Sequence, residues 1–158
     1  MNIEYKVIDE NEIDMVAPLW EKLNEHHGRL SQHFGYEYPN RTWDNRKKEL
    51  IGETTGLHVD LAKDTDTEVL VGYCISSIKR DGLGEIDSIY IESDYRRKGI
   101  GDNLMNRALQ WLKESSADRI IVQVIVDNEE AFPFYQRYGF FPRSTIFMQI
   151  VENDTSGS

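Results

Sequence analysis

A basic, glycine-containing turn separates an apolar segment from an amphipathic one within residues 84–113, and this feature constrains the fold most. The apolar segment ends near Ile91 and predicts a strand, and a helix is expected from about Gly101. The apolar residues of this helix recur at steps of three and four: Gly101, Leu104, Met105, Ala108, Leu109 and Leu112. One face of the helix is therefore expected to pack against a core.

The turn itself has the composition of a phosphate-binding loop. The first turn of a helix offers N–H donors without internal partners, and these bind anions. Gly99 and Gly101 allow a close backbone approach. Three successive cations add positive charge: Arg96, Arg97 and Lys98. The turn suits a diphosphate, although it matches neither the P-loop pattern nor the dinucleotide fingerprint.

Two motifs in this order resemble those of the GNAT (Gcn5-related N-acetyltransferase) superfamily. The first, R-x-x-G-x-G at Arg96, Gly99 and Gly101, resembles its acyl-coenzyme A loop. The second resembles N-x-x-A-x-x-x-Y-x-x-x-G-F and comprises Asn128, Ala131, Tyr135, Gly139 and Phe140. The resemblance covers residues 70–141. It implies an α/β fold with a mixed, mostly antiparallel central sheet flanked by helices on both faces, the acyl-CoA N-acyltransferase fold.

Composition is consistent with one domain over residues 1–151, followed by a frayed tail at 152–158. No apolar run is long enough to cross a bilayer and the N-terminus lacks a signal-peptide pattern, so we expect a cytoplasmic protein without membrane partners.

Cys74 is the only cysteine, and no metal site is expected. The net charge of -10 disfavours nucleic acid as a partner. It is compatible with a cationic substrate, and equally with solubility alone.

The remaining patterns predict alternating strands and helices. Expected strands cover 2–8, 57–62, 68–79, 84–91, 119–126 and 145–151, and expected helices cover about 13–23, 40–51, 101–113 and a short stretch from 128 that ends at Gly139. Pro18 should kink or break the first helix. The strands 57–62 and 68–79 read as a hairpin, with Gly72 marking a bulge or a close backbone approach.

Aromatic residues gather in the segment 26–40, where the periodic pattern disappears. In GNAT proteins the corresponding region often covers the acceptor site, so these side chains are candidates to line a pocket. The alternative is that they pack the loop onto the core.

The resemblance implies acetyl transfer from acetyl-CoA to a primary amine, either a small amine or a peptide amine. Tyr135 is the candidate acid for the leaving thiolate, and its alternative role is aromatic packing. Glu85 is the candidate base, eleven residues before Arg96, and alternation places it on one face with Asp87 and Ile89. Asp87 is an alternative base, and Glu85 is equally compatible with a solvated charge at a strand end.

The same resemblance implies a set of coenzyme A contacts. Backbone groups of Ile89, Tyr90 and Ile91 would meet the pantetheine arm. The turn would hold the pyrophosphate through Arg96, Arg97, Lys98, Gly99, Ile100, Gly101 and Asp102. Asn128 would bond the arm or cap a helix, and Phe134 lies beside Pro133, which removes a helix donor.

No Ser-His-Asp or Cys-His pattern predicts an acyl-enzyme, so direct transfer in a ternary complex is expected. The alternative from another class is a non-catalytic module that binds or senses acyl-CoA. Pairing of an exposed final strand would give a homodimer.

Overall fold

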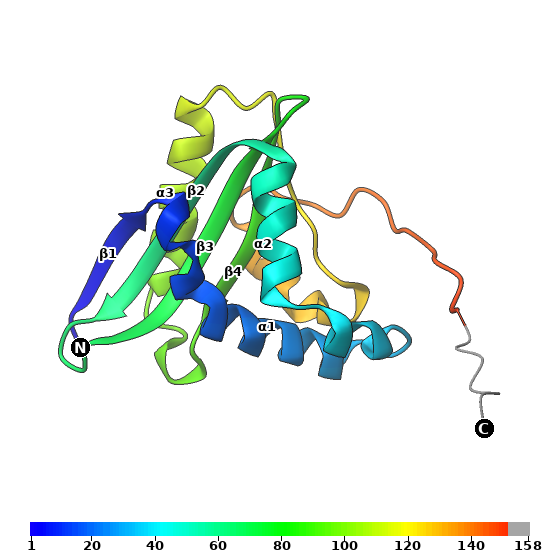
Figure 1. Ribbon diagram of the computed structural model, residues 1–158, viewed down its shortest axis with the longest axis horizontal. Helices are drawn as coiled ribbons and strands as arrows, with labels where there is room; N and C mark the ends of the chain where they lie inside the picture. Colours follow the sequence, from blue (N-terminus) through cyan, green and yellow to red (C-terminus); the bar gives the residue numbers. More distant parts are fainter. Residues whose placement is uncertain (152–158) are drawn as a thin grey trace.

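The computed structural model describes residues 1–151 and contains five strands, four α-helices and four short 3-10 helices (Figure 1). In chain order these are β1 (Ile3–Ile8), η1 (Glu10–Val16), α1 (Ala17–Leu30), η2 (Gly35–Asn40), α2 (Trp43–Gly52), β2 (Thr54–Asp64), β3 (Val69–Lys79), β4 (Leu83–Ile91), η3 (Ser93–Tyr95), α3 (Ile100–Glu114), β5 (Arg119–Val122), η4 (Val126–Ala131) and α4 (Phe132–Gln136). The predicted tail at 152–158 lies outside the described residues.

The strands form one mixed sheet in the order β1-β2-β3-β4-β5. The first three pairings along this order are antiparallel, and β4 and β5 pair in parallel. The hairpin of β2 and β3 contains a register shift beside Gly72, and a Cβ on this glycine would lie 3.1 Å from the carbonyl oxygen of Tyr90. Both expectations for Gly72, a bulge and a close backbone approach, are therefore confirmed.

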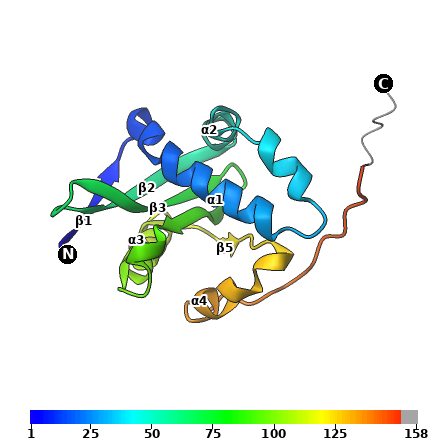
Figure 2. The same ribbon diagram turned by 90° about the horizontal axis from the view of Figure 1, so that it is seen from below.

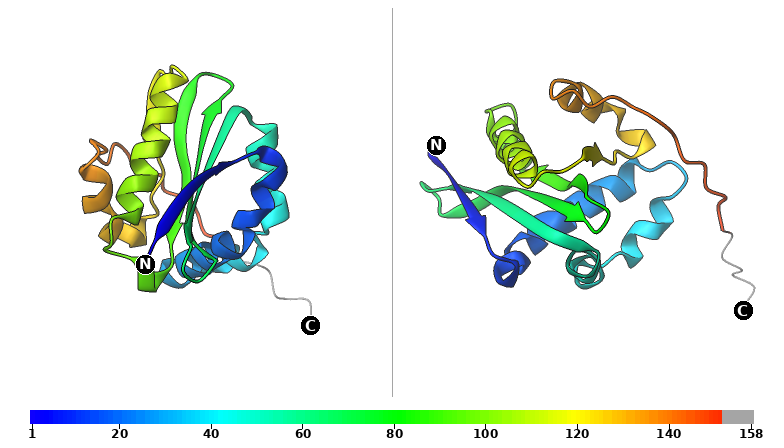
Figure 3. Two further views of the ribbon diagram at one scale, coloured as in Figure 1. Left: turned by 90° about the vertical axis from the view of Figure 1, so that its left-hand side faces the viewer. Right: turned by 90° about the horizontal axis from the view of Figure 1, so that it is seen from above.

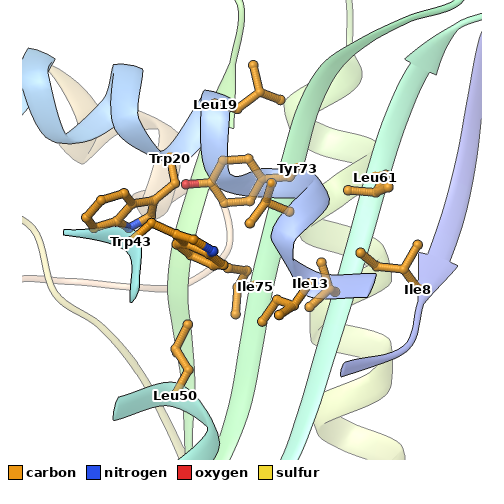
Figure 4. Close-up of a cluster of buried hydrophobic side chains, with 11 residues drawn as sticks. Ile8, Ile13, Leu19, Trp20, Trp43, Leu50, Leu61, Tyr73 and Ile75 are labelled. Atoms are coloured by element: carbon orange, nitrogen blue, oxygen red, sulfur yellow. The ribbon is translucent and has the colours of Figure 1, made fainter. Parts of the chain in front are cut away.

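Helices cover both faces of the sheet, as predicted, and each face has its own core (Figure 3). On one face, called here the α1/α2 face, η1, α1 and α2 pack against β2 and β3. Figure 4 shows this cluster, in which the rings of Trp20 and Trp43 lie 5.7 Å apart. On the opposite face, called here the α3 face, the apolar stripe of α3 is buried together with Cys74 and Ile86, and α4 packs beside it (Figure 2).

Pro18 marks the break between η1 and α1, where its missing N–H falls in the first turn and is not needed. Helix α1 continues to Leu30, beyond the predicted end. One strand prediction is wrong in extent and another is wrong altogether. Strand β5 ends at Val122 instead of 126, and residues 145–151 form no strand. Both segments lack a neighbouring strand with which to pair within residues 1–151.

None of the helices in residues 1–151 combines the length and the apolar character that a membrane crossing requires.

Candidate functional site

The central strand β4 separates from β5 halfway along its length. Pairing with β5 covers only Leu83 to Ile86, whereas pairing with β3 continues to Ile91. Within the described residues, the outer edge of residues 87–91 therefore has no strand partner. Alternate residues of this stretch direct their backbone groups to the open edge, as expected for Ile89 and Ile91, while those of Tyr90 face β3. The Ile91 carbonyl oxygen already accepts from Arg96 Nε, and the other groups on this edge can bind an extended ligand.

A β-bulge at Asp87 changes which side chains share a face. Ile86 pairs with Ser76 and Ser88 with Ile75, so Asp87 is the extra residue. Asp87 and Ser88 consequently both face the α1/α2 side, where Ser88 lies 2.6 Å from the hydroxyl of Tyr73. The prediction that Ile89 shares a face with Glu85 and Asp87 is wrong, because the bulge turns Ile89 to the α3 face.

The two candidate bases differ in how completely they are paired. The side chain of Asp87 is fully buried and accepts from Ser77 Oγ at 2.5 Å and Lys79 Nζ at 2.9 Å, with Arg46 of α2 at 3.7 Å. Glu85 contacts Lys79 Nζ at 3.1 Å and Gln123 Nε2 at 3.3 Å, and its side chain is 11% exposed. Asp87 is therefore held by two cations and a hydroxyl, whereas Glu85 has one cation and one amide as partners. Glu85 is nevertheless buried, so it is not the solvated charge at a strand end that was considered as its alternative.

Lys79 holds the two carboxylates together and remains charged. Burial alone would lower its pKa, but hydrogen bonds to Asp87 and Glu85 outweigh this effect and raise the pKa. Ser77, Lys79, Arg46 and Gln123 were not predicted from the sequence. Lys79 and Ser77 are detectable in principle, because a tight turn at 80–83 pairs β3 with β4. Side chains of both residues then lie on the same face of the sheet as Glu85. Arg46 lies on a separate helix and gives no such signal.

The turn between β4 and α3 has the backbone of an anion-binding loop. Arg97 and Gly99 have left-handed φ angles of 61° and 82°. Among residues 1–151, no oxygen accepts from the N–H groups of Ile100, Gly101 and Asp102, which point out of the first turn of α3. The side chain of Ile100 is buried, so only its backbone is available to a ligand.

The three cations of the turn are exposed, and two of them are positioned by aromatic rings. Arg96 donates from Nε to the carbonyl oxygen of Ile91 at 2.9 Å, and its guanidinium lies 5.6 Å from the centre of the Tyr90 ring. Lys98 Nζ lies 5.5 Å from the ring of Tyr95. Positive charge is therefore held beside the free N–H groups.

Helix α4 packs against the start of α3. A Cβ on Gly101 would lie 3.3 Å from Phe134 and 3.2 Å from Ile91, so any larger residue would make these two side chains shift. Asp102 accepts a hydrogen bond from the hydroxyl of Tyr138 and pairs with Arg137 at 3.0 Å. Asp102 thus ties α4 to α3.

Pro133 occupies the first turn of α4, where it removes no needed hydrogen bond. Asn128 is half-buried, with φ of -113° and ψ of 40°. No side chain caps α4, so the helix-cap alternative for Asn128 is wrong. Among residues 1–151 its side-chain amide makes no hydrogen bond.

Tyr135 lies on the α3 face, with its ring 5.2 Å from that of Phe134 and 6.4 Å from that of Phe140. Burial, with a smaller contribution from Cys74, raises the pKa of Tyr135 to about 12, so the phenol is protonated at neutral pH. Its hydroxyl bonds to none of the residues in the described part of the chain. The packing alternative is thus observed, while the hydroxyl remains available. Cys74 is buried, and burial raises its thiol pKa to about 12, which argues against a nucleophile.

The aromatic segment 26–40 is packed onto the core in part, as one of its two alternatives predicts, and its role in lining a pocket stays a prediction. Tyr38 is buried and packs edge-on against His27, whose pKa burial lowers to about 4. Phe34 and Tyr36 contact each other near the surface. The segment is tied to η4 because the backbone N–H of Gln32 donates to Asp127 at 2.7 Å. No group of three or more metal-ligating side chains occurs in the described part of the chain.

Comparisons with known proteins agree with this geometry. The chain is 30% identical over 128 residues to a mycothiol acetyltransferase of Corynebacterium efficiens, covering 80% of this chain and 41% of that protein. It is 31% identical over 101 residues to a Bacillus subtilis protein provisionally named a [ribosomal protein bS18]-alanine N-acetyltransferase, covering 64% of each. The chain thus spans less than two thirds of either relative.

A solved structure of a Pyrococcus furiosus protein, provisionally named an acetyl transferase, superposes with a TM-score of 0.74. The match is 24% identical and covers 94% of this chain and all of that one. Residues 19–140 match the model of the acetyltransferase (GNAT) family. Because this match extends over most of the chain, the chain belongs to the acetyltransferase (GNAT) family.

Proposed function

We propose that the chain is an N-acetyltransferase that moves an acetyl group from acetyl-CoA directly to a primary amine in a ternary complex. One observation carries the proposal. Within residues 1–151, the open edge of β4 leads into a cationic turn with unpartnered N–H groups, and Tyr135, whose hydroxyl makes no hydrogen bond there, packs in the same apolar cluster as Ile89, Ile91 and Ile100. An extended thioester with a diphosphate at its far end fits this order of groups.

The residues of the turn fit a diphosphate because they combine free N–H donors with exposed cations. The N–H groups of Gly99 to Asp102 would hold the pyrophosphate, with Arg97 and Lys98 supplying charge. The edge of β4 at Ile89 to Ile91 would pair with the pantetheine arm, and the free amide of Asn128 would bond it from the opposite side. Phe134 would limit the width of the site at Gly101.

Glu85 is the proposed base. An alkylamine with a pKa of about 10.4 is deprotonated about once in 2,500 molecules at pH 7, which costs about 4.6 kcal/mol. Glu85, directly or through a water, takes this proton, and the amine nitrogen then attacks the thioester carbonyl carbon. Asp87 is a weaker candidate because its oxygens are already occupied by Ser77, Lys79 and Arg46. Asp87 and Lys79 instead position Glu85.

Tyr135 is the proposed acid. When the carbon–sulfur bond breaks, the phenol donates its proton to the thiolate and coenzyme A leaves as a thiol. A thiol in water has a pKa near 8.5, well below that of Tyr135. Burial raises the pKa of a thiol as it raises that of a phenol. A thiolate formed in the same apolar surroundings therefore has a pKa closer to that of Tyr135, which makes the proton transfer easier.

We further propose that residues 1–151 act as one cytoplasmic domain whose acceptor is a small amine or a peptide amine. The net charge of -10 supports a cationic acceptor over nucleic acid. The exposed ring of Tyr36, with Phe34 beside it, supports an acceptor surface formed by the aromatic segment 26–40.

The test measures release of coenzyme A from acetyl-CoA with a panel of amines and peptides. Tyr135→Phe and Glu85→Gln should each lower kcat by at least about tenfold while acetyl-CoA binding, measured by calorimetry, stays within about twofold. Tyr5→Phe is the matched control, because it removes a phenol from the same face at the far edge of the sheet. Binding without turnover on any acceptor would favour the acyl-CoA binding module and overturn the enzyme proposal.

A further inference from the structure

Two hydroxyls meet on the α1/α2 face, those of Tyr73 and Ser88, with their oxygens 2.6 Å apart. Either oxygen is able to donate, and burial decides between them. Tyr73 lies completely buried in the core of this face, and within residues 1–151 its hydroxyl has Ser88 as its one partner (Figure 4). If Ser88 donated, the phenol proton would be enclosed without an acceptor, which is costly. Tyr73 is therefore the donor and Ser88 the acceptor.

The Ser88 hydroxyl keeps its own proton, and this proton has no partner in the described part of the chain. Ser88 is half-buried on β4, immediately after the bulge at Asp87 and at the point where β4 leaves β5. The next N–H along the chain, that of Ile89, is expected at the open edge. A hydroxyl donor and an amide donor therefore lie side by side where the two strands separate.

We propose that Ser88 donates a hydrogen bond to the thioester carbonyl oxygen of bound acetyl-CoA and to the oxyanion formed from it. This role rests on the acetyl transfer proposed above. The side chain of Ser88 stands roughly perpendicular to the sheet and the N–H of Ile89 lies in its plane, so the two donors converge on one oxygen from different directions. Tyr73 does not touch the substrate. It is a positioning residue that fixes the direction of the Ser88 hydroxyl.

The proton of Ser88 suits the carbonyl oxygen better than it suits the acceptor amine. Ser88 and Glu85 lie on the same face, so the amine approaches from the side that Ser88 occupies. A hydrogen bond to the amine nitrogen would occupy the lone pair that must attack the carbonyl carbon. A hydrogen bond to the carbonyl oxygen instead makes that carbon more electrophilic.

The hydrogen bond strengthens as the reaction proceeds, because charge develops on this oxygen. When the amine nitrogen bonds to the carbonyl carbon, one electron pair of the carbonyl double bond moves to the oxygen. When the carbon–sulfur bond breaks, that pair forms the double bond again, and the thiolate takes the proton of Tyr135. Ser88 keeps its proton throughout, so it replaces neither Glu85 nor Tyr135. Stronger donation to the oxyanion than to the neutral carbonyl lowers the barrier.

The first test needs no turnover, because it measures the carbonyl stretching frequency of acetyl-CoA bound to the full chain by isotope-edited infrared difference spectroscopy. A hydrogen bond to the carbonyl oxygen lowers this frequency. Ser88→Ala should therefore raise it, and Ser88→Thr, which retains a hydroxyl, should keep it near the wild-type value. The matched control is Ser76→Ala, which removes a buried hydroxyl of β3 that has no hydrogen-bond partner within residues 1–151 and should change nothing. An equal frequency in wild type and Ser88→Ala overturns the proposal.

Kinetics with an accepted amine then distinguish donation from a structural role. Ser88→Ala should lower kcat by about 100-fold while the KM for acetyl-CoA stays within about twofold, and Ser88→Thr should recover most of the loss. Tyr73→Phe should lower kcat less, and should add nothing to Ser88→Ala, because Tyr73 acts only through Ser88. Circular dichroism establishes that each variant is folded. A kcat of Ser88→Ala within about threefold of wild type overturns the proposal. Absence of turnover in wild type, with the infrared difference present, would count against the acetyl transfer alone.

Discussion

Replacing Lys79 with methionine should destabilise the protein by about 3–5 kcal/mol. The Nζ atom lies 2.9 Å from Asp87 and 3.1 Å from Glu85, so the two carboxylate oxygens are at most about 6 Å apart. Without the ammonium group, two like charges at about 6 Å repel by about 2.8 kcal/mol at an effective dielectric constant of 20. Asp87 also loses a charge-assisted hydrogen bond of about 1.5–3 kcal/mol, which Arg46 at 3.7 Å partly replaces.

Urea denaturation at pH 7, followed by tryptophan fluorescence, measures this loss because Trp20 and Trp43 are buried on the same face. Lys79→Arg retains the charge and should recover most of the stability. Lys47→Met is the matched control, since it removes the same side chain from an exposed pair with Asp14, and it should barely move the urea midpoint. A loss below about 1 kcal/mol for Lys79→Met would refute the view that this cation holds the two carboxylates together.

Three further perturbations follow from the structure. In Asp60, burial works to raise the pKa, but hydrogen bonds from His58 and Arg107, both at 2.8 Å, outweigh it and hold the pKa below its usual range. The ionised carboxylate of Asp60 therefore stabilises the fold above about pH 3.9, and this stabilisation is lost as the pH falls through the folded-state pKa. Asp60→Asn should lower the free energy of unfolding by about 1–3 kcal/mol at pH 7 and leave it unchanged at the acid end of a series of urea denaturations. The Cβ added by Gly99→Ala would meet no atom within 4 Å, but the alanine would have to adopt a φ of 82°. Thermal melts should therefore show a loss of about 1 kcal/mol in the free energy of unfolding, and steady-state kinetics should show a higher KM for acetyl-CoA. Gly101→Val should raise that KM more than Gly101→Ala, because the larger side chain must displace Phe134 or Ile91; equal values would contradict the packing argument.

The turn and the helix that follows it could be predicted because their signals are local. Glycine at positive φ, cations beside it and an apolar stripe at helical spacing all lie within residues 96–113, and the structure places α3 there. Tyr135 could be assigned to the same site only through its motif, because α4 is far from α3 in sequence.

The surroundings of Glu85 could not be predicted in the same way. The bulge at Asp87 depends on the register with β3, and alternation alone therefore placed Ile89 on the wrong face. Arg46 reaches Asp87 only through the packing of α2 against the sheet. The apolar pattern of residues 145–151 predicts a strand. A strand forms only where a neighbouring strand can pair with it, and a single sequence does not show where that neighbour lies.

The separation of β4 from β5 has a consequence for the kinetics of the proposed reaction. The turn and Tyr135 lie on the α3 face, whereas Glu85 lies on the α1/α2 face, so donor and acceptor would approach the same edge from opposite sides of the sheet. Neither substrate would then block the entrance of the other, and either could bind first. Initial-rate lines should intersect, and each product should compete only with the substrate that shares its entrance.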